Sequence, residues 1–435
     1  MTIKPPPQSL NRNPNLNPDN DAKVLKLIPI KPAPSIPNEV KDVCKKLSEQ
    51  GHKAWLAGGC VRDMIMGRRA RDWDIVTDAP LEKIRDLFPK HLDVGAAFGI
   101  IKLPPSGTAA APVQIDIGIF RKESGYSDHR HPDSVEIGDE KTDVARRDFS
   151  VNAMYFNPTE SHVIDHVGGH RDIQSKLLRT VGNPTERFSE DALRILRAVR
   201  FAAQLGFKID RDTATALKKC GSLLKDISRE RVRDETMRLL MTSRPVMGLE
   251  AIAQNGLWEQ VFGVRRVSIP ADLRQLKLSW TPTAMHWLAG LAVTGMLGDP
   301  LKEPDEMTER LTERLRLSNA ERRVLGRIAH IYQDATATAT SPQSSPTDWL
   351  ELAREDRPLV DLVKSFIRRA RGPSETEKDK AIALIEQTLR WVARPGAEKA
   401  WPTAEQLMKE GIKAGPKLGA ELKTRQWKAF WVKPT

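Results

Sequence analysis

The chain of 435 residues carries a formal net charge of +12 and has room for two or more domains with substantial cores. Its basic excess favours a polyanionic partner, either nucleic acid or a membrane surface. No apolar run reaches transmembrane length and no signal-peptide core follows the N-terminus, so nucleic acid is the favoured partner and no membrane is expected.

The three cysteines, Cys44, Cys60 and Cys220, lie too far apart to match a metal or disulfide spacing. We therefore expect a reducing compartment, the cytoplasm.

The N-terminal residues 1–38 are rich in Pro, Asn and Lys, which predicts a largely disordered tail. Within it, Val24 to Ile30 is apolar enough to pack on the domain that follows. A helix is predicted from Val40 to Glu49, because its apolar residues recur at helical spacing.

The stretch LAGGCVRDMIMGRRARDWDIVT, residues 56–77, combines two features of a nucleotide site. Asp72 and Asp74 open a predicted strand, whose alternation directs both carboxylates to one face. Gly58 and Gly59 lie between a strand and a helix, where backbone N–H groups can face a phosphate. Together they indicate a divalent metal holding a nucleoside triphosphate. An isolated pair of aspartates is more often turn chemistry, so distant segments must decide.

A third carboxylate is expected on a neighbouring strand. After a short helix at Leu81 to Phe88 and a strand beginning at Leu92, the segments Ile100 to Leu103 and Val113 to Phe120 are predicted to pair. Isoleucines on one face of the last segment alternate with Asp116 on the other, so Asp116 can face the first two carboxylates across a sheet. An ordinary half-buried strand explains the same pattern.

Two polar segments are expected to form loops. The first, PPSGTAAAP at residues 104–112, joins the two paired strands. The second, residues 122–141, is rich in turn formers and predicts a mobile loop over the site.

A basic helix is predicted after the second loop, with Thr142 or Asp143 as its cap. Its first turns would carry Arg146, Arg147 and Asp148. Adjacent arginines are most often solvated, but beside a candidate metal site they suit contact with phosphate.

From Phe188 the pattern is helical. The segment SEDALRILRAVRFAAQLGF is predicted to begin at a Ser189 cap. Asp191 and Arg194 then offer an acceptor and a fork of donors side by side, which can read the Watson–Crick edge of a base. A surface helix with an ordinary ion pair is the alternative. A second capped basic helix is predicted from Ser228.

These motifs resemble a known family. LAGGCVRD, RDWDIVTDA, RRDFSVNAM, IDHVGGHRDI, EDALRILRAVRFAAQLGF and ERVRDE are similar, in order and spacing, to motifs of the class II tRNA nucleotidyltransferase/poly(A) polymerase family over about residues 50–240. The resemblance implies an α+β fold, with an N-terminal nucleotidyltransferase head on a small mixed β-sheet followed by an all-helical neck, body and tail. The implied division is 1–38 (disordered tail), 39–180 (head), 181–245 (neck), 246–345 (body) and 346–435 (tRNA-binding tail).

The resemblance also implies roles for single residues. Asp72 and Asp74 would bind two Mg²⁺ ions, and Asp116 would be the third catalytic carboxylate, with its duty as general base left open because Glu is common there. Asp191 and Arg194 would form a protein template for CTP and ATP, while Arg197 and Arg200 would support their helix or bind phosphate. The remaining implied nucleotide contacts are Gly58, Gly59, Arg62, Arg147, Asp148 and Asn152.

The end of the chain separates members of this family. LMKEGIKAGPKLGAELKTRQWKAFW resembles the terminal helix-turn-helix of CCA-adding enzymes, and no basic region of the kind associated with bacterial poly(A) polymerases follows it. Basic residues interleaved with aromatic ones suit RNA, although an amphipathic core helix explains them equally well. The candidate RNA contacts are Lys413, Lys417, Arg425 and Trp427.

We therefore expect addition of CCA to the 3′ end of tRNA from CTP and ATP, with tRNA as partner and no protein partner inferred. The alternatives are a poly(A) polymerase, a specialist adding only CC or only A, and a non-catalytic RNA-binding protein on the same scaffold. The body lacks an HD phosphohydrolase signature, so no phosphatase activity is expected.

Overall fold

The computed structural model divides the chain into two compact units. Unit 1 comprises Met1–Arg194 and Phe207–Cys220, and unit 2 comprises Ile195–Gly206 and Gly221–Thr435. The structure describes residues 26–29, 35–70, 72–93, 99–108, 111–125, 133–264, 269, 283–293, 296–297, 304–336, 364, 367–368, 374–392, 402–419, 421–422 and 425.

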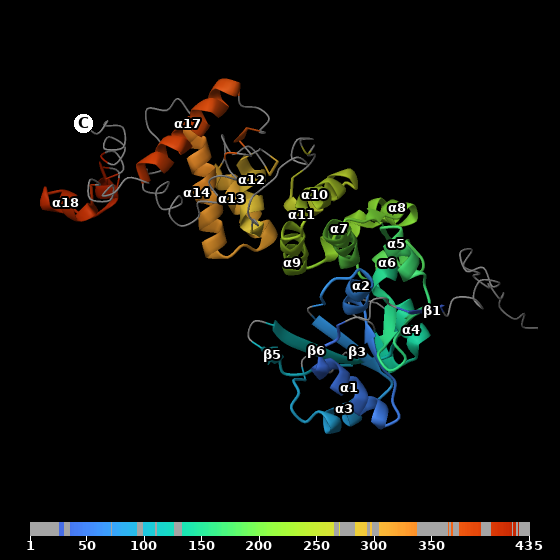
Figure 1. Cartoon of the computed structure of the whole chain (residues 1–435). Coiled ribbons are helices and arrows are strands. Elements are labelled where there is room, and N and C mark those ends of the chain that lie inside the picture. Colours follow the sequence, from blue (N-terminus) through green and yellow to red (C-terminus); the bar gives the residue numbers. More distant parts are fainter. Residues whose placement is uncertain are drawn as a thin grey trace, which may run out of the picture. The chain divides into compact units, whose positions relative to one another are not determined.

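Unit 1 contains a mixed sheet of eight described strands (Figure 1). Its order is β1-β10-β9-β2-β3-β6-β4, with β5 pairing the beginning of β6, residues 111–113. The β3–β6 pair is parallel, and the other neighbours are antiparallel. The strands are β1 (Lys26–Pro29), β2 (Ala54–Ala57), β3 (Asp72–Thr77), β4 (Ile100–Lys102), β5 (Ser106–Thr108), β6 (Ala111–Ile119), β9 (Met154–Asn157) and β10 (His162–Asp165).

Alternation in the central strands decides which face is covered. In β3, Trp73 and Ile75 are buried while Asp72 and Asp74 are exposed. Helices α1 (Asn38–Glu49) and α3 (Leu81–Leu87) lie together beside the sheet in Figure 1, and both were predicted from the sequence.

The N-terminal prediction is only partly correct. The segment expected to pack does so as β1, which pairs with β10 along its length, so the tail is not disordered as far as residue 38. Residues 1–25 lie outside the described part of the chain.

Short strands that were not predicted interrupt both predicted loops. Residues 106–108 of the first loop form β5, because they extend the ladder of β6. The ends of the second form a hairpin of β7 (Arg121–Ser124) and β8 (Ser134–Ile137), and residues 126–132 between them lie outside the described residues. In the strand predicted to begin at Leu92, Leu92 forms an isolated bridge with Lys102, and residues 94–98 lie outside the described residues.

The helix boundaries near both arginine motifs also differ from prediction. Helix α4 (Glu140–Ala145) begins at an Asp139 cap that forms a capping box with Thr142, so Arg146 and Arg147 follow the helix rather than begin it. Helix α6 (Pro184–Glu190) begins at Asn183 and already contains Ser189. The chain is extended at Asp191, and α7 (Leu193–Leu205) starts afresh.

Short elements complete unit 1. They are α2 (Gly59–Ile65), the 3₁₀ turn η2 (Ser150–Asn152), α5 (Gly169–Gln174), β11 (Leu177–Leu178), β12 (Lys208–Ile209) and α8 (Arg211–Cys220). β11 and β12 pair in parallel.

Unit 2 is helical in its described residues, so the predicted α+β architecture with a helical remainder is confirmed. The basic helix expected from Ser228 is present, although the Ser228 side chain makes no capping hydrogen bond. None of the described helices is both long and apolar enough to cross a membrane. The elements are η3 (Gly221–Asp226), α9 (Arg229–Leu240), α10 (Pro245–Gln254), α11 (Trp258–Phe262), α12 (Ala284–Val293), α13 (Pro304–Leu315), α14 (Asn319–Thr336), α17 (Glu375–Val392) and α18 (Ala404–Lys409).

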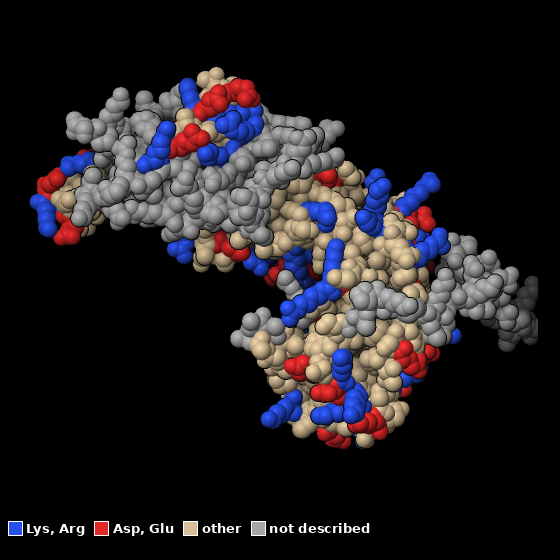
Figure 2. Space-filling model, in the orientation of Figure 1, with Lys and Arg blue, Asp and Glu red and all other residues tan. Residues whose placement is uncertain are grey.

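The described surface drawn in Figure 2 is not wholly positive. Figure 2 shows Lys and Arg side chains interspersed with Asp and Glu over the described surface in that view. Local geometry, rather than bulk charge, must therefore identify the functional surface.

Candidate active site

Three carboxylates share one face of the central strand pair. Asp74 on β3 lies directly opposite Asp116 on β6, and Asp72 lies one alternation earlier on β3. Their sequence neighbours Trp73 and Ile115 are buried on the other face. Since paired residues on parallel strands point to the same side, the register brings together the three side chains predicted from the sequence.

The charges of these carboxylates oppose one another. The pKa of the Asp74 carboxylate is raised to about 6, chiefly by burial, even though part of the residue reaches solvent. The negative charges of Asp116 and Asp72 contribute to this increase, whereas the positive charges of Arg147 and Lys102 oppose it. A group of carboxylates that repel one another at an accessible surface is suited to a divalent cation.

The glycine turn brings the backbone against this group. Gly58 has a φ of +76°, and a Cβ there would lie 3.3 Å from Arg147 Nη1 and 3.5 Å from Asp74 Oδ2. A side chain at this position would therefore be strained and crowded. Gly59 begins α2 and lies beside the Arg62 guanidinium, 3.6 Å from where its own Cβ would be.

Arg62 and Asn152 hold each other beneath the turn. The Arg62 side chain is buried, and its Nη1 donates to Asn152 Oδ1 at 2.6 Å while Nε donates to Asp63 Oδ1 at 2.9 Å. Asp148 Oδ1 accepts from the Phe149 N–H at 2.8 Å. The structure thus gathers these predicted nucleotide contacts around Gly58, with their polar groups engaged in the protein.

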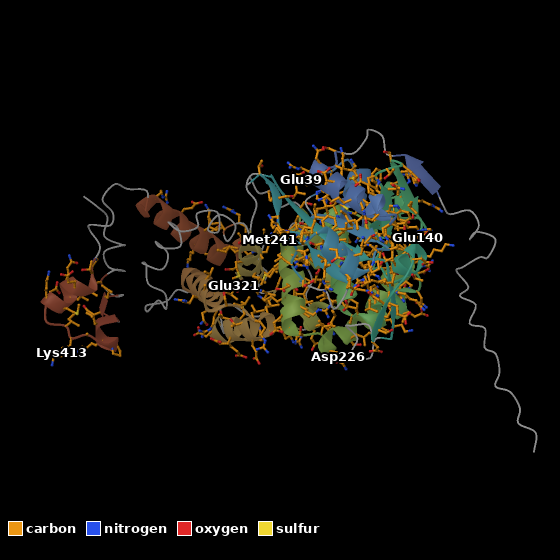
Figure 3. The ribbon with its side chains drawn as sticks, turned by 90° about the horizontal axis from the view of Figure 1, so that it is seen from below. Glu39, Glu140, Asp226, Met241, Glu321 and Lys413 are labelled. Atoms are coloured by element: carbon orange, nitrogen blue, oxygen red, sulfur yellow. The ribbon has the colours of Figure 1, made fainter. Side chains whose placement is uncertain are left out.

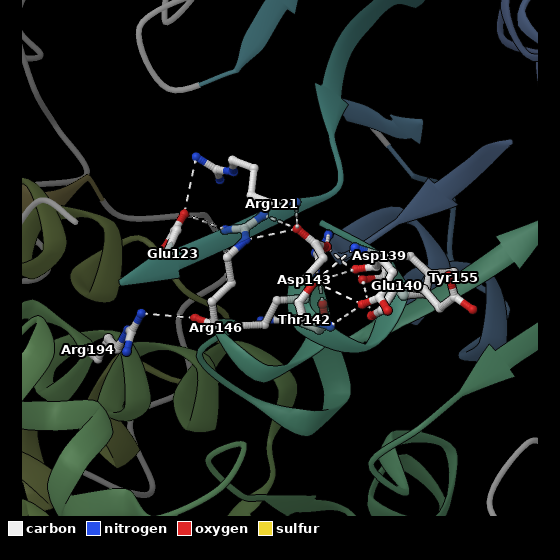
Figure 4. A network of polar contacts seen from close by, with 11 residues as sticks. Arg121, Glu123, Asp139, Glu140, Thr142, Asp143, Arg146, Tyr155 and Arg194 are labelled. Atoms are coloured by element: carbon white, nitrogen blue, oxygen red, sulfur yellow. Dashed lines mark hydrogen bonds and ion pairs between the residues drawn. The ribbon is translucent and has the colours of Figure 1, made fainter. Parts of the chain in front are cut away.

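Asp143, predicted from the sequence only as a possible cap, is buried and contacts both Arg146 and Arg147; Figure 4 shows its contact with Arg146. The Asp143 side chain is fully buried; its Oδ2 accepts from Arg147 Nη2 at 2.8 Å and from the Tyr155 hydroxyl at 2.6 Å, and its Oδ1 accepts from Arg146 Nε at 2.8 Å. Burial alone would raise the pKa of Asp143, but both guanidinium groups and the hydroxyl outweigh it and hold the pKa well below its usual range. Asp143 lies three and four residues before the two arginines, and this spacing could have predicted the ion pairs from the sequence.

The proposed base-reading pair lies at the junction of α6 and α7. Asp191 Oδ1 accepts from the Leu193 N–H at 3.1 Å. Arg194 donates to Glu190 Oε2 at 2.7 Å, to the Arg187 carbonyl at 3.1 Å and to the Arg146 carbonyl at 3.0 Å, the last drawn in Figure 4. Arg194 is therefore tied both to its own segment and to the arginine pair. Glu190, four residues before Arg194, was not singled out from the sequence.

Arg197 and Arg200 belong to unit 2, where both approach Glu235 of α9. Arg200 Nε lies 2.5 Å from Glu235 Oε2, and Arg197 Nη1 lies 3.8 Å from Oε1. Arg200 also stacks on Phe201, with 4.0 Å between its Cζ and the ring centroid. Both guanidinium groups therefore lie against the Glu235 carboxylate of α9.

The C-terminal candidates lie in unit 2. Lys413 and Lys417 are exposed, and Figure 3 shows Lys413 in the segment after α18. Arg425 pairs with Glu421 at 2.9 Å and with Glu410. Trp427 lies outside the described residues.

The donor chemistry fits a hard divalent cation, with one qualification. Asp72 and Asp74 supply the carboxylate oxygens that Mg²⁺ prefers. Within the described ranges, however, no three or more His, Cys, Asp or Glu side chains are arranged to hold a metal ion. Asp116 instead accepts from Lys102 Nζ at 2.5 Å and from Gln114 Nε2 at 3.3 Å.

Family models match two regions of the chain. One, described as the poly(A) polymerase head domain, covers residues 54–179 and thus includes the carboxylates, the glycine turn and the arginine pair. The other, described as a probable RNA- and SrmB-binding site of polymerase A, covers residues 206–264.

Individual relatives are CCA-adding enzymes. The chain is 39% identical over 252 residues to one from Limosilactobacillus reuteri, covering 58% of this chain and 61% of that protein. It is 30% identical over 379 residues to one from Lactobacillus gasseri, covering 87% and 89%. The crystal structure of the Bacillus stearothermophilus CCA-adding enzyme in complex with CTP matches with a TM-score of 0.65 and 25% identity, covering 90% of this chain and 92% of that one.

Proposed function

Because the chain belongs to the family of CCA-adding enzymes, we propose that it adds C, C and A in turn to the 3′ end of tRNA from CTP and ATP. The observation that carries this proposal is the register of Asp74 against Asp116 beside Gly58 and Arg147. It supports the proposal because carboxylates, a close backbone turn and a guanidinium on one surface are the groups that a metal–triphosphate complex would require.

The head residues supply binding and charge neutralisation. Asp72 and Asp74 would hold two Mg²⁺ ions, which when bound lower the pKa of the RNA 3′-hydroxyl and neutralise charge on the attacked α-phosphate and the leaving pyrophosphate. Gly58 lets the backbone approach the triphosphate without a side chain in the way. Arg147, fixed by Asp143, presents its guanidinium beside Asp74, where it offsets phosphate charge.

The remaining head contacts would orient the sugar. Asp148 and Asn152 offer polar groups close to Arg62 and the turn, and we propose that they contact nucleotide and ribose. Gly59 and Arg62 support this surface from α2.

Base selection would come from the α6–α7 junction. Cytosine and adenine each carry an exocyclic amino group next to a ring acceptor, whereas uracil and guanine present the opposite polarity at those positions. Asp191 would accept from the amino group and Arg194 would donate to the ring acceptor. Both lie in one compact unit with the carboxylates, and Arg194 is linked to that part of the unit through the Arg146 carbonyl.

We expect Arg194→Ala to relax base selection. Losing the donor fork should lower discrimination against UTP and GTP by about 10- to 100-fold, since a fork contact to a base edge contributes roughly 1–3 kcal/mol. The measurement is the ratio of kcat/KM for CTP over UTP, and for ATP over GTP, in single-turnover incorporation. Arg211→Ala, which removes an exposed positive charge from α8 of the same unit, is the control and should leave both ratios unchanged. Unaltered ratios in Arg194→Ala would refute the protein template.

Helical segments would hold the RNA. We propose that residues 181–245, 246–345 and 346–435 act as neck, body and tail, with Lys413, Lys417 and Arg425 near tRNA phosphates.

The three cysteines are buried and free of disulfides, which agrees with a reducing cytoplasm as the place of action.

An incorporation assay separates this function from its alternatives. Transcripts of tRNA ending at the discriminator base, at C and at CC each receive CTP, ATP or both with Mg²⁺, and products are resolved to one nucleotide. Growth by C, C and A followed by arrest is expected. Long A tails on these and unrelated RNAs would indicate a poly(A) polymerase instead, and arrest after CC, or addition of A to CC ends alone, would indicate a partial specialist.

A non-catalytic RNA-binding protein is a different class of alternative. Such a protein would bind tRNA without extending it in the same assay. The presence of all three carboxylates and of the Asp191–Arg194 pair argues against this alternative.

A further inference from the structure

Lys102 forms an ion pair with Asp116, the third carboxylate of the proposed site. Lys102 Nζ lies 2.5 Å from Asp116 Oδ2, and both side chains are partly accessible, with 37% and 23% of their surface exposed. Lys102 was not predicted from the sequence as a residue of the site. Lys102 follows the buried Ile101 in β4, and this alternation could have predicted that its side chain lies on the opposite face of the strand.

The backbone fixes this contact from two sides. Lys102 pairs with Asp116 in the β4–β6 register, so both side chains project from the same face. On its other edge Lys102 exchanges backbone hydrogen bonds with Leu92, at 2.8 Å and 3.1 Å. A lysine held on both edges of its strand keeps its ammonium group near the carboxylate face.

The second oxygen of Asp116 is engaged as well. Gln114 Nε2 donates to Asp116 Oδ1 at 3.3 Å and also to the Leu103 carbonyl at 3.2 Å. A cation that used Asp116 as a ligand would therefore compete with Lys102 and Gln114 for oxygens that already accept hydrogen bonds.

We propose that Lys102 competes with a divalent cation for Asp116 and thereby sets how tightly the site binds metal before the nucleotide arrives. This inference rests on the proposed function, because it requires a metal at Asp72 and Asp74. Lys102 is a positioning residue here. Its positive charge repels an incoming cation and its ammonium holds the third carboxylate, so both effects weaken metal binding.

The test is metal affinity without nucleotide. Mn²⁺ binding is followed by electron paramagnetic resonance, and Mg²⁺ by competition, in the full-length chain. Lys102→Met keeps the length of the side chain and removes its charge. We expect it to bind metal on the order of tenfold more tightly than wild type, because the cation no longer competes with an ammonium group for the Asp116 carboxylate.

Two controls isolate the effect. Lys102→Arg retains the charge and should stay within about twofold of wild type. Lys90→Met removes an exposed charge elsewhere in unit 1 and should leave the affinity unchanged. Equal affinities of Lys102→Met and wild type would overturn the proposal.

A double-mutant cycle separates competition for Asp116 from simple charge repulsion. In an Asp116→Asn background, Lys102→Met should raise the affinity by much less than in wild type, because the contested ligand is gone. An undiminished effect there would contradict competition. The Asp74→Asn variant tests the proposed function separately. If it binds metal as tightly as wild type, the proposed function fails, whatever the result for Lys102.

Discussion

Replacing Asp74 with Asn is expected to reduce nucleotide addition by about a thousandfold or more. Asp74 lies at the centre of the carboxylate face, between Asp72 on its own strand and Asp116 on the next. A neutral amide there removes a charged metal ligand, and metal-based charge stabilisation contributes several kcal/mol to such a transition state. Binding of tRNA should change little, because it depends on surfaces other than this carboxylate.

The same substitution should not lower stability. The pKa of Asp74 is raised to about 6, so folding favours the protonated form. The folded state binds more protons than the unfolded state between about pH 4 and pH 6, and stability therefore falls as the pH rises through that window. At neutral pH the negative charge of Asp74 lowers the free energy of unfolding, and a neutral Asn removes this destabilising charge.

Asp74→Asn should therefore lose activity while its melting temperature stays the same or rises. Activity is measured by single-turnover incorporation, tRNA affinity by filter binding and stability by thermal unfolding at pH 7. Glu82→Gln, an exposed acid on α3 of the same unit, is the control and should match wild type in all three. Turnover near the wild-type rate in Asp74→Asn would remove the basis for the metal assignment.

The carboxylate face was predictable because strand alternation is a local rule. Asp72 and Asp74 flank an apolar Trp73, and only one face of the strand can enter the core. The pairing of Asp74 with Asp116 needed more than this. Strands distant in sequence acquire their register from the packing of the whole sheet, so alternation predicted the face of Asp116 but not its partner Lys102.

Helix boundaries failed where several residues could serve as caps. Ser189 was expected to begin a helix, but Asn183 followed by Pro184 begins one earlier, with the Asn183 side chain accepting from the Thr185 N–H. Asp191 then accepts from the Leu193 N–H in the manner of a cap for the next helix. A propensity argument ranks these candidates almost equally, and tertiary contacts choose among them.

The same competition explains the role of Asp143. Asp139 takes the cap of α4 together with Thr142, which leaves Asp143 inside the helix. A charged residue is buried there only because Arg146 and Arg147 follow at the right spacing. The identity of Asp143 was visible in the sequence, but its burial depends on β9, which contributes Tyr155.

Asp143→Ala is expected to destabilise unit 1 by about 3–5 kcal/mol and to impair catalysis with it. Removing this carboxylate leaves two partly buried guanidinium groups without the anion they share, and breaking such a buried pair costs this much. The substitution also removes the carboxylate that accepts the hydrogen bond of the Tyr155 hydroxyl. The Tyr155 ring packs against those of Trp55 and Phe120. The change is measured as the free energy of opening of β9 in native-state hydrogen exchange.

The pH dependence and a matched cap variant test whether the buried ion pairs cause this loss. Because the pKa of Asp143 is held below its usual range, its stabilisation is present above about pH 4, the unfolded value, and is lost as the pH falls below it. Asp143→Ala should therefore differ most from wild type at neutral pH and progressively less in acid. Asp139→Ala removes an exposed acid from the same helix and should cost only about 1 kcal/mol, the usual contribution of a cap. Equal losses of stability in Asp143→Ala and Asp139→Ala would contradict this prediction. They would mean that the Asp143 ion pairs add nothing to stability beyond the contribution of helix α4.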